Sequence, residues 1–181
     1  MEERDVTRSD KFRYGFLIEV KMILGVVSDT HGHQVNTQNA VRMLEAFDVE
    51  VVIHCGDIGS VYIPPLFEKW PTHYVFGNVD GNQDELRDAI EAIGHHCHGL
   101  FGSLELADRS IAFLHGHDHQ LFRETVRSDE WDLVCYGHTH IAEIEQVGNT
   151  RVLNPGAVFR ARPHSVAVVE LSSLEITNVP F

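Results

Sequence analysis

The chain has 181 residues, 43% of them hydrophobic, and its 27 acidic and 14 basic residues give a net charge of −13 with neutral histidines. This length and composition indicate one globular domain with a sizeable core, and no apolar run is long enough to span a membrane. The acidic balance argues against an extended nucleic-acid footprint, which needs Lys and Arg to neutralise phosphates. Three cysteines without a CxxC pair argue against a disulfide framework and favour a reducing compartment, the cytoplasm.

The N-terminal segment has mixed charge and lacks the apolar stretch of a signal peptide. We therefore expect residues 1–21 to be an appendage, which is either disordered or absent from the native chain if translation starts at Met22. Residues 22–181 are expected to form a single domain. A chain that begins at Met22 should fold and remain active.

The first half of this domain alternates predicted strands and helices. Short apolar runs rich in Val and Ile predict buried strands at 22–28, 49–55 and 73–77. Apolar residues at helical spacing predict helices over 39–47 and 84–93. Between them, any helix after the second strand is expected to start at Pro64 or Pro65.

The second half is richer in strands. Residues 103–115 predict two strands joined at Asp108 and Arg109, followed by a short helix over 118–130 and a strand over 132–137. The remainder alternates in period two around turn signals at 148–149 and 172–173, which predicts hairpins. Strand–helix alternation followed by hairpins predicts an α/β sandwich with a mixed sheet.

Five of the apolar runs end in side chains that can bind a metal. These side chains are Asp29 with His31, Asp57, Asn78, His115, and His138 with His140. Each has an ordinary alternative role, such as a helix N-cap for Asp29, a turn residue for Asn78, or a structural histidine for His115. Ligands of open α/β sheets gather at the carboxyl ends of strands, so the joint occurrence of these residues predicts one metal site.

The ligand set predicts the kind of metal centre. Two carboxylates, four imidazoles and one amide oxygen are too many for one tetrahedral zinc and suit two divalent ions that share a carboxylate. Two ions about 3.5–4 Å apart can hold a hydroxide between them and clamp a phosphoryl group. Mixed nitrogen and oxygen donors favour manganese, iron, cobalt, nickel or zinc over calcium or magnesium.

The motifs SDTHGH, HCGDI, FGNVDG, LHGH and YGHTH resemble those of the calcineurin-like metallophosphoesterase superfamily. The resemblance covers about residues 22–181 and is greatest to small single-domain prokaryotic phosphodiesterases related to the retromer subunit of eukaryotes. It implies a four-layer α/β/β/α sandwich, the metallophosphoesterase fold, with the active site at the strand ends.

The resemblance also implies a role for each candidate residue. The implied metal ligands are Asp29, His31 and His140 for the first ion, Asp57 as the bridge, and Asn78, His115 and His138 for the second ion. The candidate catalytic residues are Asp57, Asn78, His115 and His117. The implied function is a metal-dependent phosphodiesterase that hydrolyses a small phosphate ester, with manganese as the expected metal.

Other polar residues are weaker candidates. Arg160 and Arg162 are candidates for binding the substrate phosphate, although both could be solvated loop cations. They follow the NPGA segment, which resembles an NPGS-type loop of the family with Ala157 in place of serine.

Two groups of histidines remain beside the candidate ligands. Those near the ligands in sequence, which could contact phosphate or order water, are His33, His117 and His119. Those around Cys97, which form a possible zinc site outside the strand-end series, are His95, His96 and His98.

One departure from the family concerns the type of ester. Larger phosphatases of the superfamily read GNHE where this chain reads GNVD, so that Val79 replaces a histidine thought to assist the leaving group. Valine cannot donate a proton, which predicts a preference for diesters with good leaving groups. His117 or Asp80 could supply the proton instead.

Alternative functions are a protein-binding scaffold of the same fold, as in the retromer branch, and a phosphomonoesterase. The complete set of metal-competent residues favours catalysis over the scaffold. A nuclease finds no support in the acidic composition. The expected partner is a small phosphate ester, without a membrane, and a homo-oligomer is a further expectation.

Overall fold

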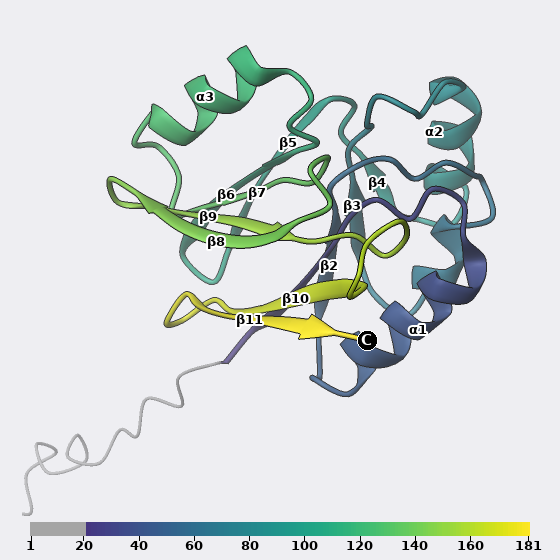
Figure 1. Cartoon of the computed structure of the whole chain (residues 1–181), viewed down its shortest axis with the longest axis horizontal. Helices are drawn as coiled ribbons and strands as arrows, with labels where there is room; N and C mark the ends of the chain where they lie inside the picture. Colours follow the sequence, from purple (N-terminus) through teal and green to yellow (C-terminus); the bar gives the residue numbers. More distant parts are fainter. Residues whose placement is uncertain (1–20) are drawn as a thin grey trace, which may run out of the picture.

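The structure, a computed structural model, describes residues 21–181 (Figure 1). Its elements are β1 (Ile23–Val27), α1 (Gln34–Glu45), β2 (Val51–His54), the 3₁₀ helix η1 (Pro64–Phe67), β3 (Thr72–Tyr74), α2 (Gln83–Glu91), β4 (His96–Cys97), β5 (Phe101–Leu106), β6 (Arg109–Leu114), α3 (His119–Arg127), β7 (Leu133–Cys135), β8 (Ala142–Val147), β9 (Thr150–Pro155), β10 (Ser165–Glu170) and β11 (Glu175–Pro180). The expectation for residues 1–21 falls, apart from Lys21, outside the described residues.

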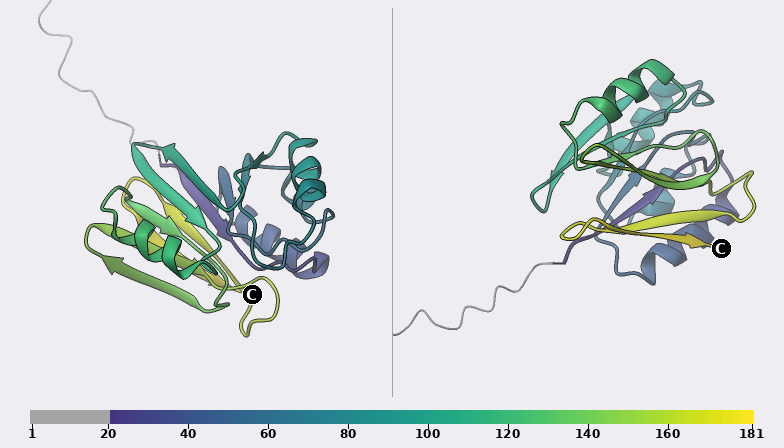
Figure 2. Two further views of the ribbon diagram at one scale, coloured as in Figure 1. Left: turned by 90° about the horizontal axis from the view of Figure 1, so that it is seen from above. Right: turned by 60° about the vertical axis from the view of Figure 1, so that its left-hand side comes forward.

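The strands form two mixed sheets. The first has the order β11-β10-β1-β2-β3-β4 and the second the order β5-β6-β7-β9-β8. In the first sheet β1 to β4 run parallel, whereas β10 pairs antiparallel with both of its neighbours, β1 and β11. In the second sheet β6, β7 and β9 run parallel between antiparallel edges. The sheets face each other, with α1 and α2 beyond the first and α3 beyond the second (Figure 2).

Three apolar cores lie between these layers. One joins α1 and α2 to the first sheet and includes Leu44 and Tyr74. The second lies between the sheets and contains Ile53 of β2 and Phe113 of β6. The third packs Val126 of α3 and its neighbours on the outer face of the second sheet. Three cores between four layers confirm the predicted α/β/β/α sandwich.

Local chemistry explains where the elements differ from the predicted ones. Helix α1 begins at Gln34, five residues earlier than its apolar spacing indicates, because His33 Nδ1 accepts the N–H of Asn36 and caps the helix. The hairpin between β5 and β6 turns at Ala107 and Asp108, both in left-handed conformation, one residue before the predicted turn. Strand β4 has only two residues and gives no sequence pattern.

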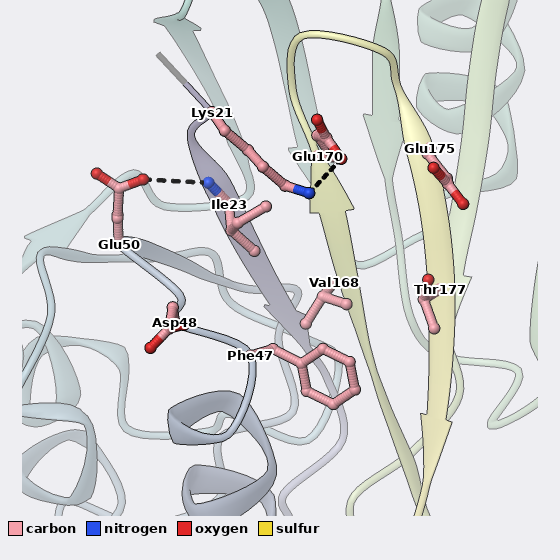
Figure 3. Close-up of a pocket in the computed structure, with 9 residues that line it drawn as sticks. All are labelled: Lys21, Ile23, Phe47, Asp48, Glu50, Val168, Glu170, Glu175 and Thr177. Carbon is pink, nitrogen blue, oxygen red and sulfur yellow. Dashed lines mark hydrogen bonds and ion pairs between the residues drawn. The ribbon is translucent and has the colours of Figure 1, made fainter. Parts of the chain in front are cut away.

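None of the helices among residues 21–181 is long and apolar enough to cross a membrane. A hollow of about 700 Å³ lies at the amino ends of β1 and β2, where Lys21 pairs with Glu170 at 2.7 Å (Figure 3). The predicted ligands lie at the opposite, carboxyl ends of these strands, so this hollow is not the predicted site.

Candidate metal centre

Strand ends from both sheets bring most of the predicted ligands together. Two groups of Asp and His side chains have ligand atoms within 4.8 Å of one another. The groups are Asp29 with His31 and His140, and Asp29 with Asp57 and His115. Five of the seven predicted ligands therefore lie in two adjacent groups that share one buried carboxylate.

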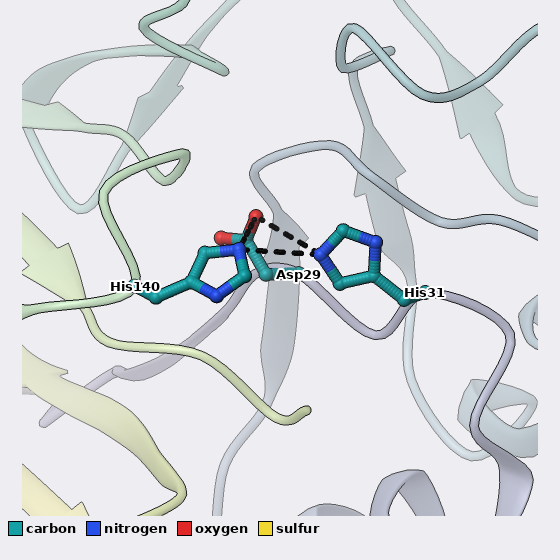
Figure 4. Close-up of side chains that lie close together, drawn as sticks. All are labelled: Asp29, His31 and His140. Atoms are coloured by element: carbon teal, nitrogen blue, oxygen red, sulfur yellow. Dashed lines mark hydrogen bonds and ion pairs between the residues drawn. The ribbon is translucent and has the colours of Figure 1, made fainter. Parts of the chain in front are cut away.

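The first group converges on Asp29 (Figure 4). Oδ1 of Asp29 lies 3.1 Å from His140 Nε2 and 3.8 Å from His31 Nε2, and the two ring nitrogens are 3.2 Å apart. His140 Nδ1 lies 3.4 Å from the carbonyl oxygen of Arg160, which can only accept a hydrogen bond. The hydrogen of a neutral His140 is therefore on Nδ1, and its Nε2 lone pair faces Asp29 and His31.

The second group is built around Asp57. His115 Nε2 lies 3.3 Å from Asp57 Oδ1, while His115 Nδ1 donates to the carbonyl oxygen of Cys55 at 2.8 Å. This second contact fixes the ring and leaves the Nε2 lone pair free, as is usual for metal-binding histidines. The other oxygen of Asp57, Oδ2, lies 3.8 Å from His31 Nε2. Asp57 thus presents one oxygen to each group.

Two buried atoms show that the site fits cations. Asp29 Oδ1 and His115 Nε2 have no hydrogen-bond partner within the described residues. The 3.1 Å contact of Asp29 with His140 has a suitable length but not the geometry of a hydrogen bond. A buried polar atom left unpaired costs about 1–3 kcal/mol. Divalent ions that accept mixed nitrogen and oxygen donors would satisfy both atoms, so the residues present fit the predicted metals.

The backbone of the centre is strained. Five of the seven predicted ligands have positive φ values between 45° and 70°, namely Asp29, His31, Asp57, His138 and His140. For a residue other than glycine this conformation costs about 1–2 kcal/mol. Such strain concentrates at functional sites, where the side chain is needed in one place.

The carboxylates and imidazoles shift one another's pKa. Burial alone would raise the pKa of Asp57, but His115 and the N–H of Val79 bring it below its ordinary value. Burial opposes protonation of His115, yet Asp57 and Asp29 raise the pKa of this imidazole. The pKa of His140 is raised, first by its contact with Asp29. The two carboxylates thus favour positive charge on His115 and His140, whereas burial, as the first cause, lowers the pKa of His31 and His138.

His138 lies beside the two groups, and Asn78 follows β3 in the chain. The backbone N–H of His138 donates to Asp29 Oδ2 at 3.1 Å, and its ring centroid lies 5.2 Å from that of His115. His138 belongs to neither group of converging ligand atoms. Asn78 is exposed in the turn after β3. The ligand roles of both residues remain predictions.

Asp80 joins two of the ligand-bearing loops. It is 3% exposed, and its oxygens accept the N–H groups of Ile58 at 3.2 Å, Gly59 at 2.8 Å and Gly77 at 2.8 Å. With its oxygens occupied in this way, Asp80 is poorly placed as a proton donor to a leaving group. Gly77 is required at this point, because a Cβ there would overlap the carboxylate of Asp57.

Asn154, in the NPGA segment, holds the loop that carries His138 and His140. Its Nδ2 donates to the carbonyl oxygen of Gly137 at 2.8 Å and to Thr139 Oγ1 at 3.1 Å. Asn154 is fully buried. The sequence motif indicated that the segment matters, but it did not indicate this positioning contact.

His54 contacts the loop after β1 that carries Asp29 and His31. Sequence reasoning did not single it out. Its Nε2 lies 3.0 Å from Thr30 Oγ1, and Thr30 donates to the carbonyl oxygen of Ile58 at 3.1 Å. Because that hydroxyl donates to Ile58, the His54 Nε2 must carry the hydrogen. Thr30 stands between Asp29 and His31, so this contact orients both.

The histidines close to ligands in sequence have different environments. His117 is half-buried, and its ring centroid lies 5.5 Å from that of His115. His33 caps α1 and stacks on Phe159 at 4.3 Å, which gives it a structural role. His119 is exposed at the start of α3.

The two arginines also differ. The carbonyl oxygen of Arg160 contacts His140, and the charge of Arg160 is one of several causes that lower the pKa of His31, the first of which is burial. Its guanidinium lies over the Phe159 ring at 5.7 Å. Arg162 is exposed. Arg160 is thus close enough to meet a substrate at the centre, whereas a role for Arg162 rests on the sequence alone.

A two-sheet α/β sandwich that gathers Asp and His side chains at the carboxyl ends of strands defines a metal-dependent hydrolase. The chain belongs to the calcineurin-like phosphoesterase superfamily, since the model of the calcineurin-like phosphoesterase superfamily domain matches residues 22–174. The resemblance predicted from the five motifs is confirmed, and the chain is a metallophosphoesterase.

Several relatives align with most of this chain. It is 34% identical over 138 residues to Phosphodiesterase MJ0936 of Methanocaldococcus jannaschii, which aligns 75% of this chain and 83% of the relative. It is 28% identical over 156 residues to the probable metallophosphoesterase YsnB of Bacillus subtilis, with 83% of each chain aligned.

Solved structures agree with this relationship. A novel archaeal phosphodiesterase superposes with a TM-score of 0.81 at 29% identity, covering 88% of this chain and 100% of that one. Vps29 of Entamoeba histolytica in complex with zinc superposes with a TM-score of 0.61 at 17% identity, covering 88% and 98% of the two chains. At that identity the second likeness shows the fold alone.

Proposed function

We propose that this metallophosphoesterase is a binuclear phosphodiesterase that hydrolyses a small phosphate ester. The observation that carries the proposal is the pair of ligand groups sharing Asp29, with two buried atoms that lack a hydrogen-bond partner among the described residues. The similarity to a protein named as a phosphodiesterase, at 34% identity, supports the same activity.

The proposed ligands follow the sequence assignment. The first ion would be held by Asp29, His31 and His140, the second by Asn78, His115 and His138, and Asp57 would be a ligand of both. Manganese is the proposed metal, with nickel, cobalt, iron and zinc as alternatives that the same donors accept. When bound, such a pair supplies Lewis acidity for the phosphoryl group and for the attacking water.

The chain's own residues would orient and neutralise the substrate. Asp57 offsets the repulsion between two close cations, because its oxygens face both ligand groups. Arg160 lies beside the first group and can approach a phosphate oxygen. Position 79 holds valine, so direct protonation of the leaving group from this place is absent. His117, at the rim of the second group, is the remaining candidate for a proton donor.

A substrate panel tests the activity. Protein stripped with a chelator and reloaded with manganese, nickel or cobalt is assayed on aryl phosphodiesters, cyclic nucleotides and aryl and alkyl monoesters. We expect hydrolysis of diesters to return with metal and to exceed that of alkyl monoesters. Loading with two ions and no hydrolysis of any ester would favour a scaffold, whereas faster hydrolysis of alkyl monoesters would favour a phosphomonoesterase.

Elemental analysis tests the binuclear centre. We expect two ions per chain in the reloaded protein. Asp57→Asn should lose more metal and more turnover than His31→Ala, because it removes the charge between the ions. Asp84→Asn, which changes an exposed carboxylate of α2, is the matched control. A stoichiometry of one, or full activity of Asp57→Asn, would contradict the proposal.

We further propose a cytoplasmic location and no nucleic-acid or membrane partner. Cys55, Cys97 and Cys135 are free, which suits a reducing compartment. Assembly into a homo-oligomer remains a prediction, which light scattering of the purified protein would test.

A further inference from the structure

A second group of imidazoles lies away from the metal centre, at the edge of the first sheet. Strand β3 pairs with the edge strand β4 so that His73 lies opposite His96. The N–H of His98 donates to the carbonyl oxygen of Tyr74 at 2.9 Å and extends this pairing by one residue. Since side chains alternate along a strand, His96 and His98 project from the same face as His73.

The three rings lie against one another. His73 Nδ1 is 3.0 Å from His98 Nε2. The rings of His73 and His96 stack with centroids 4.6 Å apart and an angle of 15°. Phe113 of the second sheet presents its ring at 79° to His98, with centroids 5.0 Å apart, and is fully buried. The packing of Phe113 thus limits the directions in which the His98 ring can point.

The neighbours of this group are other imidazoles rather than carboxylates. Burial, followed by His96, His98 and His95, lowers the pKa of His73 to about 4. At neutral pH the ring is uncharged and keeps a lone pair on one nitrogen. Cys97 lies on the opposite face of β4, where it packs against the core below α1 and α2. His95 stacks on Tyr74, which belongs to that same core.

We propose that His73, His98 and His96 form an additional binding site for a divalent ion that prefers nitrogen ligands, namely nickel, copper or zinc. Imidazole nitrogens bind such ions at about 2.0–2.1 Å, so two of them at a right angle to each other lie about 2.9 Å apart. The 3.0 Å separation of His73 Nδ1 and His98 Nε2 matches this spacing. At the metal centre the corresponding pair, His31 and His140, is 3.2 Å apart.

His96 completes the set. Its ring stacks on His73 and its side chain is exposed, so a rotation of this side chain would direct a third nitrogen at the ion. Without that rotation, the ligand atoms of His73, His96 and His98 do not all lie within 4.8 Å of one another among the described residues. The group differs from the sequence-derived zinc cluster of His95, His96 and His98, because pairing of β3 with β4 brings in His73 while His95 turns to the other core.

This site differs from the metal centre in its ligands, which are imidazoles without carboxylates. Sites made of imidazole alone follow the order of affinity in which copper, nickel and zinc exceed manganese, whereas carboxylates also suit manganese. An ion held here would tie the two-residue edge strand β4 to β3. It would therefore stabilise the fold without taking part in hydrolysis.

Metal titration of the whole protein tests the proposal. Full-length protein loaded with manganese is dialysed against nickel, and bound metals are counted by elemental analysis. We expect wild type to bind one nickel ion per chain more than His98→Gln does under the same conditions. Loss of one nitrogen ligand should weaken this ion by about 100-fold or more, since even loss of a supporting contact costs about 10–100-fold. His119→Gln, an exposed histidine of α3, is the matched control and should bind as wild type does.

Two further measurements keep the result interpretable. His96→Ala changes an exposed side chain and should fold normally, yet it should also weaken the additional nickel ion. Copper bound to protein that also carries Asp57→Asn should show nitrogen couplings in electron paramagnetic resonance that His98→Gln reduces, because it removes one of the three nitrogen ligands. Equal nickel content in wild type, His98→Gln and His96→Ala would overturn the proposal. It would mean that His73 and His98 share only a hydrogen bond.

Discussion

His31 and His140 are 109 residues apart in sequence, yet their Nε2 atoms face each other at 3.2 Å. The hydrogen of a neutral His140 is directed at the carbonyl oxygen of Arg160, so two ring nitrogens and the Asp29 carboxylate surround the same point. Both histidines have left-handed backbone conformation. The chain thus accepts strain to direct nitrogen lone pairs to the place where a cation would bind.

This strain predicts how the metal-free protein responds to glycine. His140 has φ of 60°, which favours glycine over other residues by about 1 kcal/mol. In the presence of a chelator, His140→Gly should therefore be more stable to urea than His140→Ala by about this amount. At the exposed helical position Arg123 the order should reverse, with glycine less stable than alanine by about 1 kcal/mol. Equal stability of the two His140 variants would show that the backbone is not strained.

A second prediction concerns Asp80, which binds the N–H groups of Ile58, Gly59 and Gly77. Asp80→Ala leaves these donors without their acceptor and should destabilise the protein by about 3 kcal/mol. It should also weaken metal binding, because Asp57 lies in one of the loops. Asp80→Asn keeps one acceptor oxygen, so its stability and metal affinity should lie between those of wild type and Asp80→Ala. Urea denaturation and metal analysis measure both effects, with Asp84→Ala as control. Wild-type metal affinity in a folded Asp80→Ala would refute the positioning role.

A third prediction concerns pH and the buried His54. Burial, the largest cause, lowers the pKa of His54 from 6.5 to about 3. The folded state therefore keeps His54 neutral, while the unfolded chain takes up a proton below pH 6.5. The corresponding stability is present in full above this pH and declines as the pH falls towards 3. Between pH 7 and pH 5 this linkage should remove about 2 kcal/mol.

Urea denaturation at pH 7 and pH 5 tests this linkage. His54→Gln should lose that part of the decline, whatever its overall stability, whereas His119→Gln should keep it. An identical decline in wild type and His54→Gln would mean that His54 is protonated in the folded state.

Much of the centre could be predicted from sequence because strand ends are marked locally. Val and Ile runs stop at a glycine or serine, and the polar residue that follows must lie at a sheet end, as for Asp29 after Ser28 and Asp57 after Gly56. Parallel strands then bring such residues together without further information. The α/β sandwich followed from the alternation of strands and helices, whereas the four layers were implied by the resemblance of the motifs to the family.

The supporting contacts could not be predicted because they join segments distant in sequence. The N–H groups that Asp80 binds at Ile58 and Gly59 lie more than twenty residues away, and nothing local distinguishes it from a turn aspartate. Likewise, His73 meets His98 only through the pairing of β3 with β4, a strand too short to give a pattern. Periodicity places residues on a face but does not indicate which strands are neighbours.

The last prediction concerns the ester that the protein prefers, and it depends on Val79. This residue is 45% exposed, and its N–H donates to Asp57 Oδ1 at 3.1 Å, so its side chain stands beside the proposed bridge. Valine cannot protonate a departing oxygen, and Asp80 is committed to backbone N–H groups. The rate on aryl diesters should therefore fall steeply as the pKa of the leaving group rises.

Substitutions at position 79 test this prediction directly. General-acid help is worth about 10²–10⁴-fold, so Val79→His should raise the rate on poor leaving groups by about 100-fold and leave good ones nearly unchanged. Val79→Gln, which is polar but cannot protonate the leaving group, is the control and should behave as wild type. The measurement is kcat/KM across aryl diesters of graded leaving-group pKa.

A flat dependence in wild type would show that another residue supplies the proton. His117, whose ring centroid lies 5.5 Å from that of His115, is the remaining candidate, so a steep dependence appearing only in His117→Ala would then identify it as the donor.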